Sequence, residues 1–272
     1  MHEQPPVVLT IAGSDSSGGA GLHADVRTMS ALGVHCATAV TLVSAQNTAE
    51  FRSAVPMPPG MVLSQIEAVL DDLPVVATKT GLLFTEANIH AVATIAENGR
   101  LPLLVVDPVM VGMQGRSLYD ADTEKLIAER LVPHARVITP NHLEAGRLLG
   151  LELTGDLDEL VDAARQLGEL GPEAVVISGG RRSVDGTAPV VTDVCVVGEQ
   201  VTMLESPWVE TPNVRGSGDT LSAAIAARLA IGDTVIDALR SAHAFTAEAL
   251  RVSASWRLGA GQGPLGHFHS PR

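Results

Sequence analysis

The chain has 272 residues, of which 46 % are hydrophobic and only 3 % aromatic, a composition typical of a soluble α/β enzyme with a core of valine, alanine and leucine. Its formal net charge of −13 argues against binding to nucleic acids or anionic membranes, because both call for basic patches. No apolar run approaches membrane-spanning length, and the opening MHEQPP lacks the basic start of a secretion signal, so a cytoplasmic location is expected.

Short apolar runs alternate with helical patterns from one end of the chain to the other. Strands are predicted, in chain order, at residues 7–12, 35–43, 75–79, 103–107, 136–138 and 174–178. Helices are predicted at 21–32, 61–70, 87–97, 123–131 and 142–149, from 156 onward, at 216–230 and at 233–251. Residues 190–197 and 201–205 flank a glycine-containing turn, which indicates a hairpin.

This alternation predicts a three-layer αβα, doubly wound fold with a mostly parallel sheet and one late antiparallel hairpin. No linker or internal repeat divides the chain, so residues 1–272 are expected to form a single domain. Ligands of such sheets bind where the carboxyl ends of the strands meet. The polar segments that follow the predicted strands are therefore the candidate site.

A glycine-rich loop, GSDSSGGAG at residues 13–21, follows the first strand. It has neither the spacing of a Rossmann fingerprint nor the Lys-Ser/Thr pair of a P-loop, so it fits neither nucleotide motif. Either it is an ordinary strand–helix loop, or its backbone lies flat against the ring of a ligand. Asp25, in the helix that follows, is either a solvated side chain or a ligand contact.

The segment SAQNT at residues 44–48 comes at the end of the second predicted strand. The primary amide of Gln46 can donate and accept hydrogen bonds at once, which matches the edge of an aminopyrimidine. An ordinary polar turn is the alternative.

Two carboxylates follow neighbouring strands, Asp107 in DPVM and Glu144 in TPNHLE. Asn141 is a predicted helix N-cap, and Glu144, three residues later, suits the partner position of a capping box. Alternatively, Asp107 and Glu144 hold Mg²⁺ through water molecules, since Mg²⁺ takes few direct carboxylates together with phosphate oxygens.

The stretch TPNVRGSGDTLSAAIAARLA at residues 211–230 contains a helix that begins after two glycines. The N–H groups at a helix start bind anions, so Gly216, Ser217 and Gly218 are predicted to form an anion hole. Asp219, in the first helical turn, is then the candidate base that takes a proton from a substrate hydroxyl. An anion hole, a Mg²⁺-binding acidic pair and a proton acceptor together indicate phosphoryl transfer.

The chain resembles the hydroxymethylpyrimidine/phosphomethylpyrimidine kinases of thiamine biosynthesis, within the ribokinase-like superfamily. The resemblance covers nearly the whole chain through TIAGSDSSGGAGLHAD, AQNT, TKTGLL, DPVM, TPNHLEA, GSGDT and GQGPLGHFH, in this order. It implies ATP and Mg²⁺ as cofactors and phosphorylation of 4-amino-5-hydroxymethyl-2-methylpyrimidine (hydroxymethylpyrimidine below). A second phosphorylation, of the monophosphate, and a homodimer are also implied.

Carried over by position, the resemblance assigns Asp219 as the catalytic residue and Gly216, Ser217 and Gly218 as the anion hole. It implies that the pyrimidine pocket contains Gln46, Gly13, Ala20, Asp25, Leu82 and Val109. Asp107 and Glu144 are placed near Mg²⁺, and Asn141, Ser178 and Arg215 near the phosphates of ATP.

Three positions depart from the family pattern. Asp219 stands where many members carry cysteine, and Leu82 where methionine is common, a change that conserves volume. Ser178 replaces a lysine common before two glycines, which removes a cation near the phosphates. Arg215 and Arg181 are candidates to supply that charge, although arginine is not equivalent to lysine as a compact phosphate contact.

Two other functions stay open. Pyridoxal kinases share the fold, the anion hole and an aspartate base, and their substrate also bears a hydroxymethyl group. The segments AQNT and GQGP favour the pyrimidine. A ligand-binding relative without catalytic activity is the other alternative, and the presence of Asp219, Asp107, Glu144 and both anion-hole glycines argues against it.

Overall fold

The computed structural model describes residues 4–112, 117–183 and 188–268. Its main sheet has the strand order β11-β10-β8-β7-β6-β5-β1-β2, with β9 paired to β10. The strands from β2 to β8 in this order run parallel, whereas β10 is antiparallel to β8, β9 and β11. The bounds are β1 (Val7–Ala12), β2 (His35–Val40), β5 (Val75–Thr80), β6 (Leu104–Val106), β7 (Val137–Ile138), β8 (Ala174–Ile177), β9 (Arg181–Arg182), β10 (Val190–Val197) and β11 (Gln200–Pro207). The predicted fold class and the late β10–β11 hairpin are confirmed.

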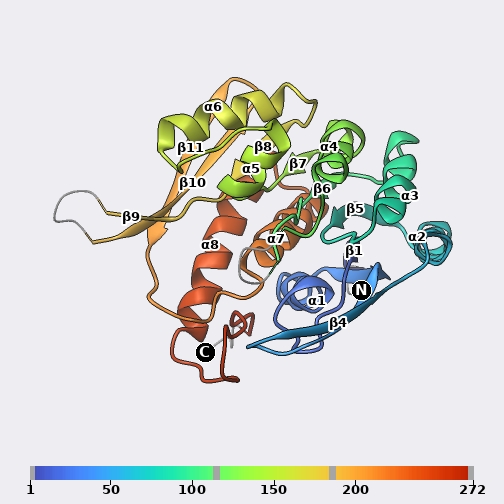
Figure 1. The fold of residues 1–272 in the computed structure, drawn as a ribbon, viewed down its shortest axis with the longest axis horizontal. Helices are drawn as coiled ribbons and strands as arrows, with labels where there is room; N and C mark the ends of the chain where they lie inside the picture. The colour runs from blue at the N-terminus through green and yellow to red at the C-terminus, as the bar shows by residue number, and fades with distance from the viewer. Residues whose placement is uncertain (1–3, 113–116, 184–187, 269–272) are drawn as a thin grey trace.

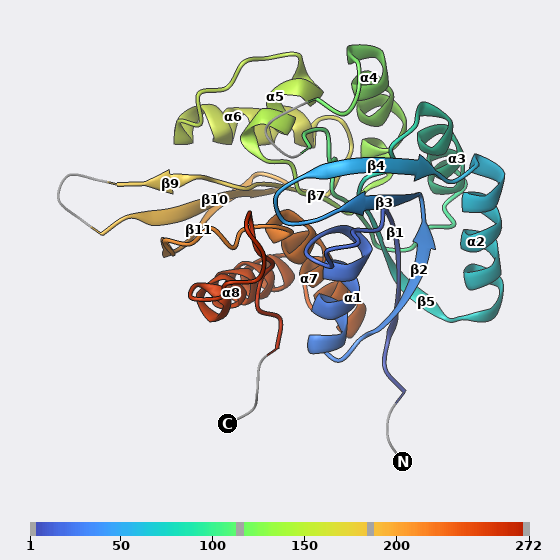
Figure 2. The same cartoon turned by 60° about the horizontal axis from the view of Figure 1, so that its bottom comes forward.

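Helices cover both faces of the sheet, as Figures 1 and 2 show. One layer contains α2 (Pro59–Asp72), α3 (Glu86–Glu97), α4 (Ala121–Arg130), α5 (His142–Leu149) and α6 (Leu157–Gly168). The other contains α1 (Gly21–Ala31), α7 (Ser217–Ile231) and α8 (Val235–Ser253). No helix within the described ranges combines the length and the apolar character that crossing a membrane requires.

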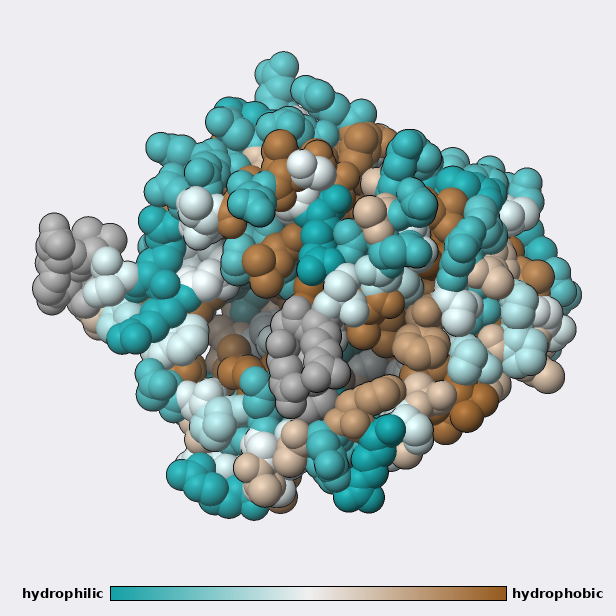
Figure 3. All heavy atoms as spheres, viewed as in Figure 1, coloured by the Kyte–Doolittle hydropathy of each residue, from teal (hydrophilic) through white to brown (hydrophobic). Residues whose placement is uncertain are grey.

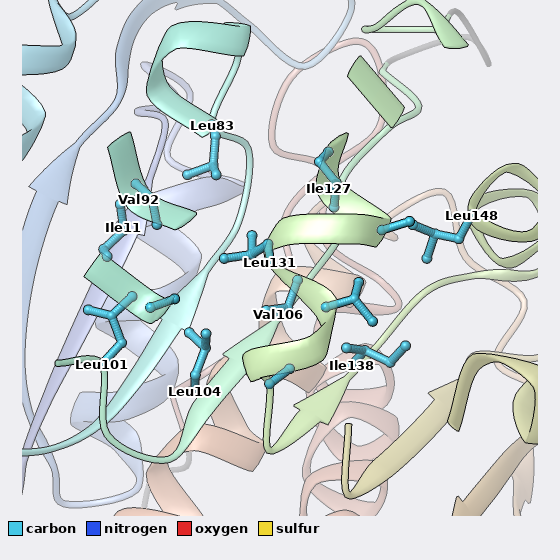
Figure 4. Packing of buried hydrophobic residues seen from close by; sticks show 14 of the residues in the cluster. Ile11, Leu83, Val92, Leu101, Leu104, Val106, Ile127, Leu131, Ile138 and Leu148 are labelled. Carbon is cyan, nitrogen blue, oxygen red and sulfur yellow. The ribbon is translucent and has the colours of Figure 1, made fainter. Parts of the chain in front are cut away.

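Apolar side chains fill two cores, one on each face of the sheet. In β1, Leu9 and Ile11 belong to the core under α2 to α6, whereas Val8 belongs to the core under α1, α7 and α8. Figure 4 shows the first core, with Ile11 beside Val92 and with Val106 beside Leu131. A strand buried on both faces needs apolar residues at consecutive positions, which is why these strands read as continuous apolar runs in the sequence.

The helix α7 lies at the centre of its layer, packed between α1 and α8 and against β1, β5 and β6. Its alanines at 223, 224, 226 and 227 are fully buried, and their small side chains allow close approach to the sheet. This packing places the N-terminus of α7 beside the loops that follow β1 and β6.

One predicted strand was wrong, and one antiparallel pair of strands was not predicted. Residues 35–43 do not form one strand, because β2 ends at Val40 and β3 (Leu42–Gln46) pairs antiparallel with β4 (Phe51–Pro56) in a separate two-stranded sheet. The late hairpin is thus not the only antiparallel insertion. The break between β2 and β3 could not be predicted, because the run at 39–43 contains no glycine, proline or other turn residue. The strand β4 could not be predicted either, because nearly all of it is exposed and its sequence lacks the alternation of a half-buried strand.

Candidate active site

A tight turn leads into α7 and shapes its N-terminus. Gly216 has a φ of +83°, and a Cβ at this position would lie 2.2 Å from the carbonyl oxygen of Gly19, so glycine is required. Among the residues that the structure describes, no side chain caps α7. The first turn at Ser217, Gly218 and Asp219 is therefore free of a side-chain acceptor, which suits the predicted anion hole.

The carboxylate of Asp219 is held at both of its oxygens. Oδ2 accepts a hydrogen bond from the N–H of Gly21 at 2.9 Å, and Oδ1 lies 3.1 Å from Nζ of Lys79. The side chain keeps 15 % of its surface exposed. An oriented carboxylate with one accessible side has the arrangement that a general base needs.

Lys79, on β5, is fully buried and stands at the centre of the acidic residues. Its Nζ lies 2.9 Å from Asp25, 3.1 Å from Asp219 and 3.9 Å from Asp107. The sequence reasoning did not single out Lys79. A lysine inside a strand of valine, alanine and threonine was the available signal, because a buried lysine needs a carboxylate partner.

Asp25, predicted as a solvated residue or a ligand contact, is fully buried beneath Lys79. Its Oδ2 accepts a hydrogen bond from the Thr10 hydroxyl at 2.6 Å, and both oxygens contact Nζ of Lys79. Burial raises the pKa of Asp25 to about 6, against the lowering effect of Lys79. In the structure, the carboxylate of Asp25 binds the ammonium group of Lys79. Contact between Asp25 and a ligand stays a prediction.

Asn141 and Glu144 form the predicted capping box at the start of α5. Oδ1 of Asn141 accepts from the N–H of Glu144, and Oε2 of Glu144 accepts from the N–H of Asn141, both at 3.0 Å. Oε1 of Glu144 also accepts from the N–H of Met110 at 3.2 Å. The capping prediction is confirmed, and it leaves Glu144 facing the segment that follows Asp107.

Asp107 lies deep in the same acidic group. The Ser222 hydroxyl of α7 donates a hydrogen bond to Oδ2 of Asp107 at 3.0 Å. Burial raises the pKa of Asp107, and the neighbouring Asp219 and Glu144 raise it further, whereas Lys79 lowers it. One buried ammonium group therefore faces several carboxylates, and the excess negative charge favours a divalent cation.

The carboxyl group of Glu144 should make the stability of the metal-free protein depend on pH. Burial raises the pKa of Glu144 from its ordinary 4.5 to about 7. The folded protein thus retains a proton that the unfolded chain releases, so this contribution is complete below about pH 4.5 and is lost as the pH rises through about 7. Over this window Glu144→Gln should gain on the order of 3 kcal/mol in the free energy of unfolding relative to wild type.

Denaturant unfolding without Mg²⁺ at pH 4.5, 6 and 8 measures this difference. The control is Glu129→Gln, because Glu129 has 62 % of its side chain exposed. A difference between wild type and Glu144→Gln that stays constant across the three pH values would refute the raised pKa.

Asp15 organises the glycine-rich loop, and the sequence reasoning missed this role. Its carboxylate accepts hydrogen bonds from the N–H groups of Ser17, Gly19 and Ala20, at 2.9, 3.2 and 3.0 Å. Nε of Arg215 donates to Asp15 at 2.8 Å, and both side chains are buried. The loop is therefore held in one shape, packed against the turn that precedes α7.

The predicted pyrimidine residues lie around this loop. The hydroxyl of Ser16 donates to the carbonyl of Gln46 at 2.6 Å and accepts from the N–H of Gln46 at 2.8 Å, which places Gln46 beside the loop. Gly13 lies against Leu42. Thr41 donates its hydroxyl to the carbonyl of Leu82 at 2.7 Å.

The remaining two residues of this group, Ala20 and Val109, are half-buried. Ala20 precedes α1 directly, and the N–H of Val109 bonds the carbonyl of Asp107 at 2.9 Å. The structure thus brings the predicted pyrimidine residues to the side of α7 where Asp219 lies.

An open pocket lies on the other side of the α7 N-terminus, with a cavity volume of about 200 Å³. Figure 3 shows a hollow near the middle of the face that is viewed in Figure 1. The polar residues in its lining include Ser178, Asp193, Ser217 and His243. The predicted anion hole thus separates this pocket from the acidic group.

The two arginines proposed to replace the absent lysine have different surroundings. Arg215 donates to Asp15 and does not line the pocket. The guanidinium of Arg181 lies 6.0 Å from the ring centre of Trp208, which does line the pocket. Arg181 does not line the pocket either, but its position beside Trp208 makes it the better placed of the two to compensate for Ser178.

The family model for phosphomethylpyrimidine kinase matches residues 15–266 of the chain. A hydroxymethylpyrimidine/phosphomethylpyrimidine kinase of Synechococcus elongatus is 42 % identical over 268 residues, which cover 97 % of this chain and 98 % of the relative. The kinase of the same description from Mycobacterium tuberculosis is 42 % identical over 266 residues, 96 % of this chain and 93 % of the relative.

Solved structures show the same fold. A Bacillus subtilis pyridoxal kinase in complex with ADP has a TM-score of 0.86 at 34 % identity, covering 97 % of this chain and 98 % of that chain. A phosphomethylpyrimidine kinase of Clostridium difficile has a TM-score of 0.78 at 31 % identity, covering 90 % of this chain and 99 % of that chain.

Proposed function

Because the chain belongs to the phosphomethylpyrimidine kinase family, we propose that it transfers the γ-phosphoryl group of ATP to the hydroxymethyl group of hydroxymethylpyrimidine. The enzyme acts in thiamine biosynthesis, as a hydroxymethylpyrimidine/phosphomethylpyrimidine kinase. The observation that carries this function is the position of Asp219, an oriented carboxylate in the first turn of an uncapped helix.

Asp219 is the general base of the reaction. Its accessible side takes the proton of the substrate hydroxyl, and the oxygen of that hydroxyl attacks the γ-phosphorus of ATP. The N–H groups of Gly216, Gly218 and Asp219 stabilise the charge on the phosphoryl group during transfer, whereas the N–H of Ser217 bonds the carbonyl of Val214 at 3.2 Å. One donor of this kind contributes roughly 2.7–4 kcal/mol in comparable sites.

The two substrates approach the N-terminus of α7 from opposite sides. The pyrimidine binds where Gln46 and the loop at residues 13–21 converge, beside Asp219. The nucleotide occupies the open pocket that Ser178, Ser217 and Gly218 help to line, with its phosphates toward α7. In this proposal the hydroxyl and the γ-phosphate meet at the anion hole.

Asp107 and Glu144 suit a Mg²⁺ ion that is bound with the phosphates of ATP. Within the described residues, no group of three or more histidine, cysteine, aspartate or glutamate side chains could hold a metal ion by itself. Mg²⁺ does not need such a cage, because it keeps water ligands and binds phosphate oxygens. When bound, the ion neutralises phosphate charge, while Asp107 and Glu144 supply carboxylate oxygens from the protein.

The relatives favour a pyrimidine substrate over pyridoxal. Several solved structures similar to this chain are pyridoxal kinases, one of them from Staphylococcus aureus in complex with AMP-PCP and pyridoxal. The pyridoxal kinases are 31–34 % identical, and the solved phosphomethylpyrimidine kinase of Clostridium difficile is 31 % identical, whereas the pyrimidine kinases from Synechococcus and Mycobacterium reach 42 %. The acidic group, the glycine turn and Asp219 are all in place, which supports a catalyst rather than a ligand-binding relative.

Three further features are part of the proposal. The monophosphate is phosphorylated a second time, in the same site. Residues 1–272 work as one domain, and two chains form a homodimer. The outer face of the β3–β4 sheet supports the homodimer, because Val43, Phe51 and Val55 expose 51 %, 51 % and 63 % of their surface there.

Mass spectrometry of the reaction products tests the function. Incubation with ATP, Mg²⁺ and hydroxymethylpyrimidine should yield the monophosphate first and the pyrophosphate later. Accumulation of the monophosphate alone would remove the second step from the proposal, and the absence of both products would remove the function.

Replacing Gln46 with alanine should weaken pyrimidine binding selectively. The amide supplies one or two hydrogen bonds to the ring, each worth about 0.5–1.5 kcal/mol, so the KM for hydroxymethylpyrimidine should rise about 2- to 150-fold. The KM for ATP should stay within about twofold. Gln200→Ala, at an exposed position in β11, is the control in the same steady-state assay. Equal increases of the two KM values would exclude a ring contact by Gln46.

A further inference from the structure

The C-terminal segment at residues 259–267, GAGQGPLGH, lies between two parts of the candidate active site. It follows α8 and passes the turn that joins β3 to β4, as Figures 1 and 2 show. From there it runs to the turn that precedes α7. It therefore contacts both the segment that carries Gln46 and the start of the predicted anion hole.

The first part of this C-terminal segment packs against Thr48, two residues after Gln46. The N–H of Gly261 donates to Oγ1 of Thr48 at 3.1 Å, and the N–H of Gln262 donates to the carbonyl oxygen of Thr48 at 3.0 Å. A Cβ at position 261 would lie 2.0 Å from that carbonyl oxygen, so the close approach requires glycine. The turn at Thr48 is thus fastened to the C-terminal segment.

The second part of the C-terminal segment holds the start of α7. The carbonyl oxygen of Gly263 accepts a hydrogen bond from the N–H of Arg215 at 3.1 Å. Nε2 of His267 lies 2.9 Å from the hydroxyl of Thr220, which donates to the carbonyl oxygen of Gly216 at 2.7 Å. That hydroxyl has a single hydrogen, so Nε2 of His267 is the donor in its contact with Thr220. The segment therefore holds the turn that shapes the anion hole.

The main sheet does not fix the position of Gln46. Within the described ranges, β3 and β4 pair with each other and with no strand of the main sheet. Gln46 is the last residue of β3, and its backbone is held by the hydroxyl of Ser16. The turn that follows is held by the C-terminal segment. The position of Gln46 relative to α7 therefore depends on contacts between loops.

We propose that the C-terminal segment positions Gln46 relative to the anion hole, with Gly261 and Thr48 as the positioning residues. This inference rests on the proposed function in that Gln46 contacts the ring of the substrate. The bound ring must bring its hydroxymethyl group to Asp219, and a misplacement of about 1 Å can lower a rate about 10²-fold. A segment fastened to both turns sets this distance.

Steady-state kinetics of Gly261→Ala test the proposal. Gly261 does not have a positive φ, so alanine fits the backbone, and its methyl group must push the turn at Thr48 away. The KM for the ring substrate should rise about 2- to 13-fold, the value of one hydrogen bond between Gln46 and the ring. The KM for ATP should stay within about twofold. Gly60→Ala is the control, because Gly60 is exposed on α2 with space for a methyl group.

A double variant shows whether the effect passes through Gln46. In the Gln46→Ala background the bond to the ring is already absent, so Gly261→Ala should change the KM by less than about twofold. An undiminished effect of Gly261→Ala in this background would overturn the proposal.

Variants of Thr48 test the same contact from the other side. Thr48→Val loses the oxygen that accepts from the N–H of Gly261, so the KM for the ring substrate should rise. Thr48→Ser keeps a hydroxyl at this place and should restore the wild-type KM. A KM for Thr48→Ser as high as that of Thr48→Val would contradict a role of the hydroxyl.

Thermal unfolding of the same variants separates positioning from stability. If Gly261→Ala and Thr48→Val unfold more easily but keep the wild-type KM, the segment is structural and the proposal fails. Equal increases of the KM for ATP and for the ring substrate would also overturn it. All variants are compared on the ring substrate that the wild type phosphorylates, so a wild type active with pyridoxal alone would count against the proposed function only.

Discussion

Replacing Asp219 with asparagine should lower kcat for hydroxymethylpyrimidine about 10²- to 10⁴-fold, the usual contribution of a general base. The KM values for both substrates should stay within a few-fold, because the removed interaction forms only as the substrate hydroxyl loses its proton. Asparagine has the shape of aspartate and can still accept from the N–H of Gly21. The start of α7 and the anion hole should therefore keep their form.

Steady-state kinetics of Asp219→Asn, together with its thermal unfolding, separate catalysis from folding. Asp162→Asn is the matched control, since Asp162 lies on α6 with 71 % of its side chain exposed. A kcat for Asp219→Asn within threefold of wild type would remove Asp219 as the base. A large fall in thermal stability would instead show that Asp219 has a structural role.

Replacing Lys79 with methionine should destabilise the protein by about 3–5 kcal/mol, the range found when one partner of a buried ion pair is removed. Methionine fills nearly the same space, so the loss reflects charge. Without the ammonium group, Asp25, Asp107 and Asp219 face one another with no cation among them. Denaturant unfolding at neutral pH without Mg²⁺ measures the change.

A double variant shows whether the charge is the cause. Asp25→Asn in the Lys79→Met background removes one uncompensated carboxylate and can keep the bond to Thr10, so it should recover about 1 kcal/mol or more. Lys125→Met, at a site with 70 % of the lysine side chain exposed, should have little effect. If the two substitutions at positions 79 and 25 destabilise additively, the proposed ion-pair network is wrong.

The positions of the candidate site were largely predictable from the sequence. Parallel strands place their carboxyl ends at one edge, so Asp107 and the loop at residues 13–21, in segments far apart in the sequence, were expected to meet. The glycine turn before Asp219 identified the helix start on local grounds, because backbone geometry at Gly216 excludes other residues. Local rules were sufficient for these features.

The contacts that hold the site together were not predictable. Lys79 and Asp15 are each defined by partners on other elements, Asp219 and Arg215, and a single sequence does not show such pairs. The pair of His243 and Asp193 joins α8 to β10 across 50 residues of chain. Each of these residues is an ordinary polar residue until the fold supplies its neighbour.

Glu144 shows a limit of a different kind. The spacing of Asn141 and Glu144 predicted a capping box, which the structure has, and the chemistry of the strand ends predicted a Mg²⁺ ligand. The two roles do not exclude each other, because a capping carboxylate near Asp107 can also bind an ion with the phosphates. Sequence spacing predicts the cap, whereas only the charge of the assembled group favours the ion.

The most direct test of the central claim compares substrates in one assay. Consumption of ATP is measured with hydroxymethylpyrimidine and with pyridoxal, each offered separately with Mg²⁺, to obtain kcat/KM for both. A higher kcat/KM for hydroxymethylpyrimidine is the predicted result, and Gln46→Ala should reduce that preference. Turnover with pyridoxal alone would contradict the proposed function.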